Sequence, residues 1–435
     1  MSRPAPGYAT LSDWIAHEAI PFAIDAPDAV AAAVDTMIAA LDDSVELLGF
    51  GEALHGGEAL LLLRNRLFQR LVEAHGYSAI AIESSFPRGQ IVNEYIAGRG
   101  PADYTEVEET GFSHRFGQLD TTRELVEWMR DYNADPAHDV KLRFYGCDSP
   151  TDMIGTDSPR TVLYAVLDYL AAIDGDRSRQ RRERIDALIG SDADWENPAA
   201  SMDPSVAVGQ SAAAVALRIE TEELISELQI RRPELIARSD TERYLEALHY
   251  ATTARQLLND HAVLARESED RISHLLGIRD VIMADNLAYM VARERGRGKV
   301  LAFTHNRHLQ QAQIEWQLGP HFNIWWPAGA HLRSMLGPRY VVVGSALGVS
   351  EANGIEQPEP GTLEALLAGL PESAALIPTH QGRGLPASEI AALPIRSGST
   401  RNPGYAVLEP TSFNDFDWLV FVDSTTFSRG WPELP

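Results

Sequence analysis

Glu52 and His55 stand three residues apart, just after the apolar run Val45 to Phe50. An imidazole beside a carboxylate is a common general base, because the acid orients the ring and stabilises its protonated form. Gly56 and Gly57 follow at once, and their missing side chains allow close approach to His55. This arrangement predicts acid–base chemistry in which His55 activates water.

Two further charged residues lie near this turn in the sequence. Arg64 sits among leucines in the helical pattern Ala59 to His75, and Glu83 ends the apolar run Ala79 to Glu83. A purely structural interpretation is also available, since a strand-end Glu often pairs with an Arg, and a His after a strand often bonds a loop carbonyl. Together, however, a base, two carboxylates and an Arg at neighbouring strand ends favour a functional site.

A second cluster follows the buried run Lys299 to Phe303. His305 and His308 stand three residues apart there and are suited to acid–base work, to oxyanion stabilisation or to metal binding. Because the chain has no His-Glu-x-x-His motif, we expect no metal, although ligation by these two histidines stays open. On the preceding helix, we interpret Arg279 and Asp280 as packing and salt-bridge positions.

Short apolar runs that alternate with amphipathic stretches must position these residues. This alternation predicts an α/β fold with a largely parallel central sheet flanked by helices. The predicted strands are Val45–Phe50, Ala79–Glu83, Lys141–Gly146, Lys299–Phe303, Phe322–Trp325, Tyr340–Gly344, Tyr405–Leu408 and Trp418–Val422.

The middle of the chain has helical patterns and no convincing strand. Ala212–Leu228, Thr241–Ala265 and Arg271–Glu294 carry apolar residues at helical spacing. We therefore divide the chain into a first part of the α/β core (1–158), a helical insertion (159–295) and a second part of the core (296–435). The insertion is expected to cap the site and to enclose a largely apolar ligand.

The composition of the chain disfavours several classes of binding partner. A formal net charge of −25 disfavours nucleic acid and anionic lipid surfaces. No segment has the length and apolarity of a membrane span or a signal peptide, so the expectation is a cytoplasmic protein without a membrane partner. Cys147 is the only cysteine, which excludes an intrachain disulfide. The oligomeric state is not indicated.

Several familiar catalytic motifs are missing. The chain has no Gly-x-Ser-x-Gly nucleophile elbow, no Walker A loop and no Gly-x-Gly-x-x-Gly fingerprint. Cys147, with apolar neighbours, is interpreted as a core residue rather than a nucleophile. We therefore expect no cofactor and direct activation of water by the His and carboxylate residues.

Two motifs resemble those of the erythromycin esterase family. Gly51-Glu52-Ala53-Leu54-His55-Gly56 is similar to the family's Gly-Glu-x-Thr-His-Gly signature, with Leu54 in place of Thr. Leu301-Ala302-Phe303-Thr304-His305-Asn306-Arg307-His308 is similar to its apolar strand followed by His-Asn-x-His. Shorter matches run along most of the chain, including Phe144-Tyr145-Gly146-Cys147-Asp148 and Arg279-Asp280-Val281-Ile282-Met283-Ala284-Asp285-Asn286.

The resemblance implies an α/β core with helical additions and hydrolytic opening of a macrolide lactone without a covalent serine intermediate. It also implies that His55 is the base and that the family's other site residues match Glu52, Arg64, Glu83, His305 and His308. The predicted function is thus hydrolysis of an ester or lactone of a natural product. Two alternatives stay open: acyl transfer, lactonisation or rearrangement at the same site, and a metabolite-binding protein without turnover.

Overall fold

The computed structural model describes residues 7–152, 155–318 and 321–430. Its centre is an eight-stranded sheet with the order β1-β11-β12-β10-β2-β7-β3-β4. The six strands from β12 to β4 are mutually parallel, whereas β11 runs antiparallel to β12 and to β1. The predicted α/β fold with a largely parallel sheet is confirmed. The strands are β1 (Ile20–Phe22), β2 (Leu47–Glu52), β3 (Tyr77–Ser85), β4 (Arg143–Asp148), β7 (Lys299–His305), β10 (Tyr340–Val349), β11 (Ala374–Pro378) and β12 (Trp418–Ser424).

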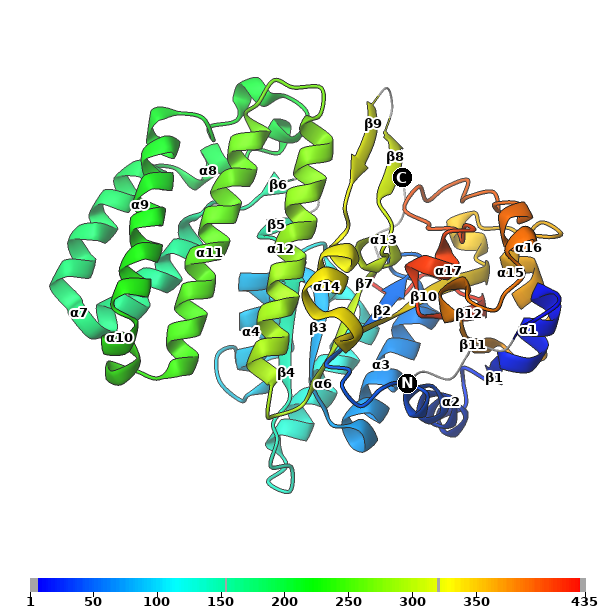
Figure 1. Ribbon diagram of the computed structural model, residues 1–435. Helices are drawn as coiled ribbons and strands as arrows, with labels where there is room; N and C mark the ends of the chain where they lie inside the picture. Colours follow the sequence, from blue (N-terminus) through cyan, green and yellow to red (C-terminus); the bar gives the residue numbers. More distant parts are fainter. Residues whose placement is uncertain (1–6, 153–154, 319–320, 431–435) are drawn as a thin grey trace.

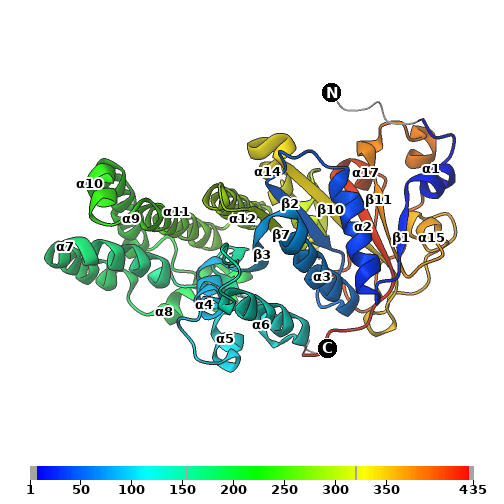
Figure 2. The same cartoon turned by 90° about the horizontal axis from the view of Figure 1, so that it is seen from below.

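Helices cover both faces of this sheet (Figure 2). The sheet therefore separates two apolar clusters, one on each face. Alternate residues of each strand face opposite sides, so Ala79 and Ala81 belong to one apolar cluster and Ile80 and Ile82 to the other. The Ile side is covered by α2 (Pro27–Ala39), α3 (Glu58–His75), α5 (Tyr104–Thr110) and α6 (Asp120–Ala134). The Ala side is covered by α1 (Leu11–Glu18), α12 (Arg271–Glu294), α14 (Ala328–Leu336) and α15 (Leu363–Leu367), while α4 (Phe86–Ile96) packs on β4.

The segment between β4 and β7 is mainly helical. Figures 1 and 2 show α7, α9, α10 and α11 standing together beside the β4 edge of the sheet. Helix α12 packs against α11 on one side and against β4 and β7 on the other, so it joins this bundle to the sheet. Its helices are α7 (Arg160–Ile189), α8 (Asp192–Trp195), α9 (Ala212–Ile230), α10 (Arg232–Arg238), α11 (Thr241–Leu264) and α12. Within the described part of the chain, none of the helices is long and apolar enough to cross a membrane.

Two predicted strands differ in the structure. Tyr405–Leu408 is not a strand: it crosses the strand-end edge as an irregular segment, where the Ala406 amide donates to the Ala53 carbonyl at 2.8 Å. Phe322–Trp325 is extended but lies outside the central sheet, in a hairpin of β8 (Ile314–Leu318) and β9 (His321–Trp325). The reason is that an apolar run favours extended backbone without specifying which strand it pairs with.

The remaining elements are short. A second small hairpin, β5 (Thr151–Asp152) with β6 (Gly155–Thr156), follows β4 directly. The short helices are α13 (Asn306–Leu309), α16 (Ala387–Ala392) and α17 (Ser412–Asp415).

Candidate functional site

The candidate residues converge because four neighbouring parallel strands end at the same edge. Glu52 at the end of β2 is paired in register with His305 at the end of β7. Glu83 lies near the end of β3, beside β7, and Asp148 closes β4. Ligand sites of parallel sheets lie at this carboxyl edge. The structure thus brings all four side chains to one place.

His55 lies in the turn that joins β2 to α3 and is held by Glu52. Its Nδ1 is 2.5 Å from Glu52 Oε1, and its side chain is 30% exposed whereas that of Glu52 is 3% exposed. Among the described residues, the second Glu52 oxygen is buried without a hydrogen-bond partner. The ring therefore has a fixed orientation, with Nε2 directed toward Glu83 Oε1 at 3.7 Å.

The two carboxylates shift the pKa of His55. Burial disfavours the imidazolium, but the negative charges of Glu52 and Glu83 outweigh it and raise the pKa above 6.5. Burial also raises the pKa of Glu52, although His55 opposes this effect. A base of this kind binds a proton more strongly than a free imidazole does, so it is neutral only at higher pH.

Glu83 contacts several of the other site residues. Its Oε1 lies 2.9 Å from Arg279 Nη2 and 3.3 Å from His308 Nε2, and its Oε2 accepts the His305 backbone N–H at 2.7 Å. Burial alone would raise its pKa, but His308, His55 and Arg279 hold it well below 4.5. Glu83 is consequently an anion at any physiological pH.

His308 is clamped between two carboxylates. Its Nδ1 bonds Asp280 Oδ1 at 2.7 Å, and its Nε2 faces Glu83. Burial lowers its pKa, but the charges of Asp280 and Glu83 outweigh burial and raise it to about 10. Asp280 is itself fixed by Trp325 Nε1 at 2.6 Å and by the Ala328 amide at 3.1 Å. His308 is therefore a buried imidazolium at neutral pH.

His305 is different. Its ring centroid lies 4.9 Å from that of His55, but its Nε2 bonds the Gly404 carbonyl at 2.8 Å and its Nδ1 accepts the Arg307 amide. Burial and the neighbouring His55 lower its pKa well below 6.5. This ring is thus neutral with its proton on Nε2, and the loop-carbonyl interpretation describes its contacts.

Arg64 lies behind the other candidates. Its side chain is buried and donates to Asn65 Oδ1 at 2.9 Å and to the Thr121 carbonyl at 3.3 Å. It stands over the Phe303 ring, and among the ion pairs that the structure describes the strand-end Glu83 is bound by Arg279 rather than by Arg64. Burial lowers its pKa to about 10, and its charge acts on Glu52 at a distance.

The sequence did not predict that α12 and the end of β4 supply residues to the site. Arg279 and Asp280 are indeed salt-bridge positions, but their partners are Glu83 and His308 of the site. Arg279 also donates to Asp148 at 2.6 and 2.9 Å, and His114 lies 3.1 Å from the same carboxylate. The pair Arg279-Asp280 was visible in the sequence, but spacing alone does not show what a helix residue faces across the fold.

The structure bears on two other chemistries, nucleophilic attack by Cys147 and metal binding. The Cys147 thiol is buried, donates to the Ile82 carbonyl at 3.1 Å and has a pKa that burial raises well above 9.0, so it is unsuited to nucleophilic attack. The part of the chain that the structure describes contains no group of three or more His, Cys, Asp or Glu side chains arranged to hold a metal ion.

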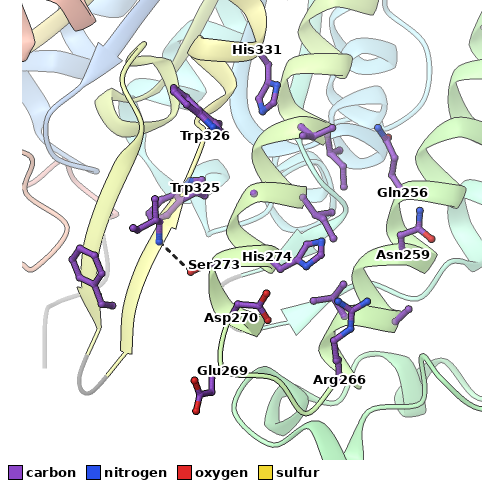
Figure 3. A pocket seen from close by; sticks show the side chains of 18 of the residues that line it. Gln256, Asn259, Arg266, Glu269, Asp270, Ser273, His274, Trp325, Trp326 and His331 are labelled. Atoms are coloured by element: carbon purple, nitrogen blue, oxygen red, sulfur yellow. Dashed lines mark hydrogen bonds between the residues drawn. The ribbon is translucent and has the colours of Figure 1, made fainter.

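Two hollows flank helix α12. A polar cavity of about 250 Å³ lies next to Arg279 and His114. A larger groove of about 990 Å³ uses residues such as His274, Gly277 and Val281, which helical spacing places on the opposite face from Arg279. Figure 3 shows this groove between α11, α12 and β9, with Trp325 and Trp326 on one side and Gln256 and Asn259 on the other. His55 lines neither hollow, but Arg279, which contacts Glu83, lines the polar cavity. Glu52 and Glu83 line a third cavity, which measures only about 10 Å³.

Sequence comparison assigns the chain to a family. The sequence model of the family described as Erythromycin esterase matches residues 72–425. The chain belongs to the erythromycin esterase family. Its match includes Glu83, Asp280, His305 and His308 but begins after His55. A curated relative, erythromycin esterase type II of Escherichia coli, is 25% identical over 339 residues, which is 76% of each chain.

Several solved structures share the fold. A protein of Bacillus cereus superimposes with a TM-score of 0.73 at 18% identity, covering 97% of this chain and 98% of that one. A succinoglycan biosynthesis protein has a TM-score of 0.69 at 20% identity over 97% and 98%. The erythromycin esterase EreC, in an open conformation, has a TM-score of 0.67 at 16% identity over 94% and 98%. Family membership indicates a hydrolase of the esterase type.

Proposed function

We propose that this protein hydrolyses an ester or lactone of a natural product with water that His55 activates. The arrangement of Glu52, His55 and Glu83 carries the proposal. Glu52 holds Nδ1 of the ring, and the 3.7 Å between Nε2 and Glu83 Oε1 exceeds a direct hydrogen bond. A water that contacts both atoms would be oriented for attack on a carbonyl carbon.

The steps follow from the protonation states. Neutral His55 takes a proton from water, and Glu52 stabilises the resulting imidazolium as the orienting acid of a triad does. The hydroxide forms a bond to the carbonyl carbon, and the ester C–O bond then breaks. The imidazolium returns its proton to the leaving alkoxide, so no covalent enzyme intermediate is needed.

His308 is the candidate that suits oxyanion stabilisation best. Its ring is a buried imidazolium that Asp280 and Glu83 hold in place, so its positive charge is available to stabilise a developing oxyanion beside Glu83. His305 Nε2 is engaged by the Gly404 carbonyl, and Arg64 is buried beneath Glu52. In this assignment, His305 forms part of the wall beside His55, and the positive charge of Arg64 lowers the pKa of Glu52.

The substrate class rests on the relatives. Since the Escherichia coli relative is named an erythromycin esterase, macrolide lactones are the first compounds to assay. A polar site that admits water favours hydrolysis over acyl transfer or lactonisation. We further propose that residues 159–295 form an insertion that caps the site, with Arg279 and Asp280 of α12 at Glu83 and His308, and with Asn197, Ser201 and Asp260 at the neighbouring cavity.

The test compares His55→Gln with wild type. Opening of erythromycin, measured by mass spectrometry, and hydrolysis of p-nitrophenyl butyrate are expected to fall by at least ~10²-fold. The matched control is His75→Gln, because His75 also pairs with a carboxylate, Asp35, but lies at the far end of α3. Equal rates for wild type and folded His55→Gln would refute the proposal. Unaltered binding of a ligand that is never turned over would instead support a binding protein.

A further inference from the structure

A polar cavity adjoins the proposed reaction site. It lies beyond the end of β4, between the β5–β6 hairpin and the facing ends of α11 and α12. Its volume is about 250 Å³. Arg279 is common to both places, because it lines the cavity and also contacts Glu83 at 2.9 Å. Arg279 thus stands between Glu83 and this space, and a substrate with its ester group at His55 would have to pass alongside Arg279 to enter the cavity.

The lining of the cavity combines polar groups with the apolar side chains of Trp195, Leu264, Leu275 and Leu276. The polar groups are the ones that need hydrogen-bond partners. They include the hydroxyls of Ser149, Thr151, Thr156 and Ser201, the amide of Asn197, and the charged groups of Asp260 and Arg279. An apolar substituent would remove water from these groups without offering hydrogen bonds in return, which is costly. A substituent with several hydroxyl groups would satisfy them.

Asp260 lines the cavity with a carboxyl group, one oxygen of which can bond a ligand. It lies on the last turns of α11, where Thr156 Oγ1 donates to its Oδ2 at 3.0 Å. The structure describes no hydrogen bond to its Oδ1, although the residue is half-buried. Burial raises the pKa of this carboxyl to about 7, despite the nearby Arg279. Near neutral pH the group is thus able both to accept and to donate a hydrogen bond.

From this geometry we propose, on the basis of the function proposed above, that the polar cavity is a subsite for a hydroxylated, sugar-like substituent of the substrate. Asp260 is then a specificity-determining residue that bonds a hydroxyl group of that substituent. The inference goes beyond the esterase chemistry, because it concerns which ester is chosen rather than how it is cleaved.

A pair of esters with the same scissile bond provides the test. Methyl 6-O-butyryl-glucoside and cyclohexylmethyl butyrate differ in whether a sugar or a carbocycle follows the ester oxygen. Wild type is expected to favour the glucoside in kcat/KM, and Asp260→Ala is expected to reduce this preference by about 10- to 100-fold, as for a lost hydrogen bond to a charged group. Turnover of the carbocyclic ester should change little.

Two controls separate the outcomes. Asp285→Asn alters another carboxyl with a raised pKa, which is bonded by Gln256 outside the cavity lining, and it should leave the preference unchanged. Binding of methyl glucoside, measured by saturation-transfer NMR, should be weaker in Asp260→Ala than in wild type and needs no turnover. If the preference and the binding are the same in Asp260→Ala as in wild type, the subsite is wrong, while His55-dependent hydrolysis still supports the proposed function. If no ester is hydrolysed, the proposed function fails, and the NMR comparison alone decides about the cavity.

Discussion

Replacing Asp280 with Asn tests whether the buried imidazolium of His308 serves the reaction. In the wild type, the pKa of His308 is raised from 6.5 to about 10, a difference that corresponds to about 5 kcal/mol in favour of the charged form. The His308 side chain is only 11% exposed, so solvent screens these interactions weakly. Burial opposes the charge, and Asp280 is the strongest favourable partner, ahead of Glu83. Loss of one close opposite charge typically lowers such a pKa by about 1–3.

The pH dependence follows from these directions. Activity should rise as His55 loses its proton, above its ordinary pKa of 6.5, and should fall as His308 loses its proton near pH 10. In Asp280→Asn, the alkaline fall should move to about pH 7–9. Because the positive charge of His308 lowers the pKa of His55, its loss should also move the acid limb upward. The two limbs approach each other, so the maximal kcat/KM should drop.

The assay is a kcat/KM profile from pH 5 to 11, with the His308 titration followed by NMR in the same variant. Asp285→Asn, five residues along the same helix, is the control and should keep the wild-type profile. Circular dichroism checks the fold, since Asp280 also accepts from Trp325 and Ala328. If NMR shows that the pKa of His308 has fallen while the alkaline limb stays near pH 10, the imidazolium has no role in the rate.

Two other predictions concern Glu83 and metals. Glu83→Gln removes the anion that Arg279 and His308 share, so it should lower the free energy of unfolding by about 3–5 kcal/mol, measured by urea denaturation, as well as activity; an unchanged unfolding midpoint would show that these charges are satisfied without it. Chelation is expected to leave activity intact, and elemental analysis should find no stoichiometric metal; bound zinc whose removal and return switch activity off and on would make His305 and His308 ligands.

The sequence predicted the sheet and the strand-end positions of the candidate residues, but not the contacts that set their charges. The strand-end positions of Glu52, Glu83 and His305 follow from hydrophobic patterning, since parallel strands end at a common edge. Asp148 was available to the same strand-end argument but was not selected, because its partner Arg279 comes from a distant helix, and nothing local marks His114, which lies 3.1 Å from Asp148. The short strands β1 and β11 were missed as well, because three to five residues give little periodic signal.

The pKa values of two buried carboxylates at one sheet edge are shifted in opposite directions, and this difference suits them to different roles in the proposed mechanism. Glu52 has one close cationic partner, His55, and an unbonded buried oxygen, so burial dominates and raises its pKa. Glu83 is surrounded by Arg279, two histidines and a backbone N–H, which hold its pKa low. Neighbouring acids with divergent pKa values divide acid–base work between them. In the proposed mechanism, Glu83 therefore stays an anion throughout a cycle and keeps its cationic partners in place, whereas Glu52 stabilises His55 when that ring is protonated.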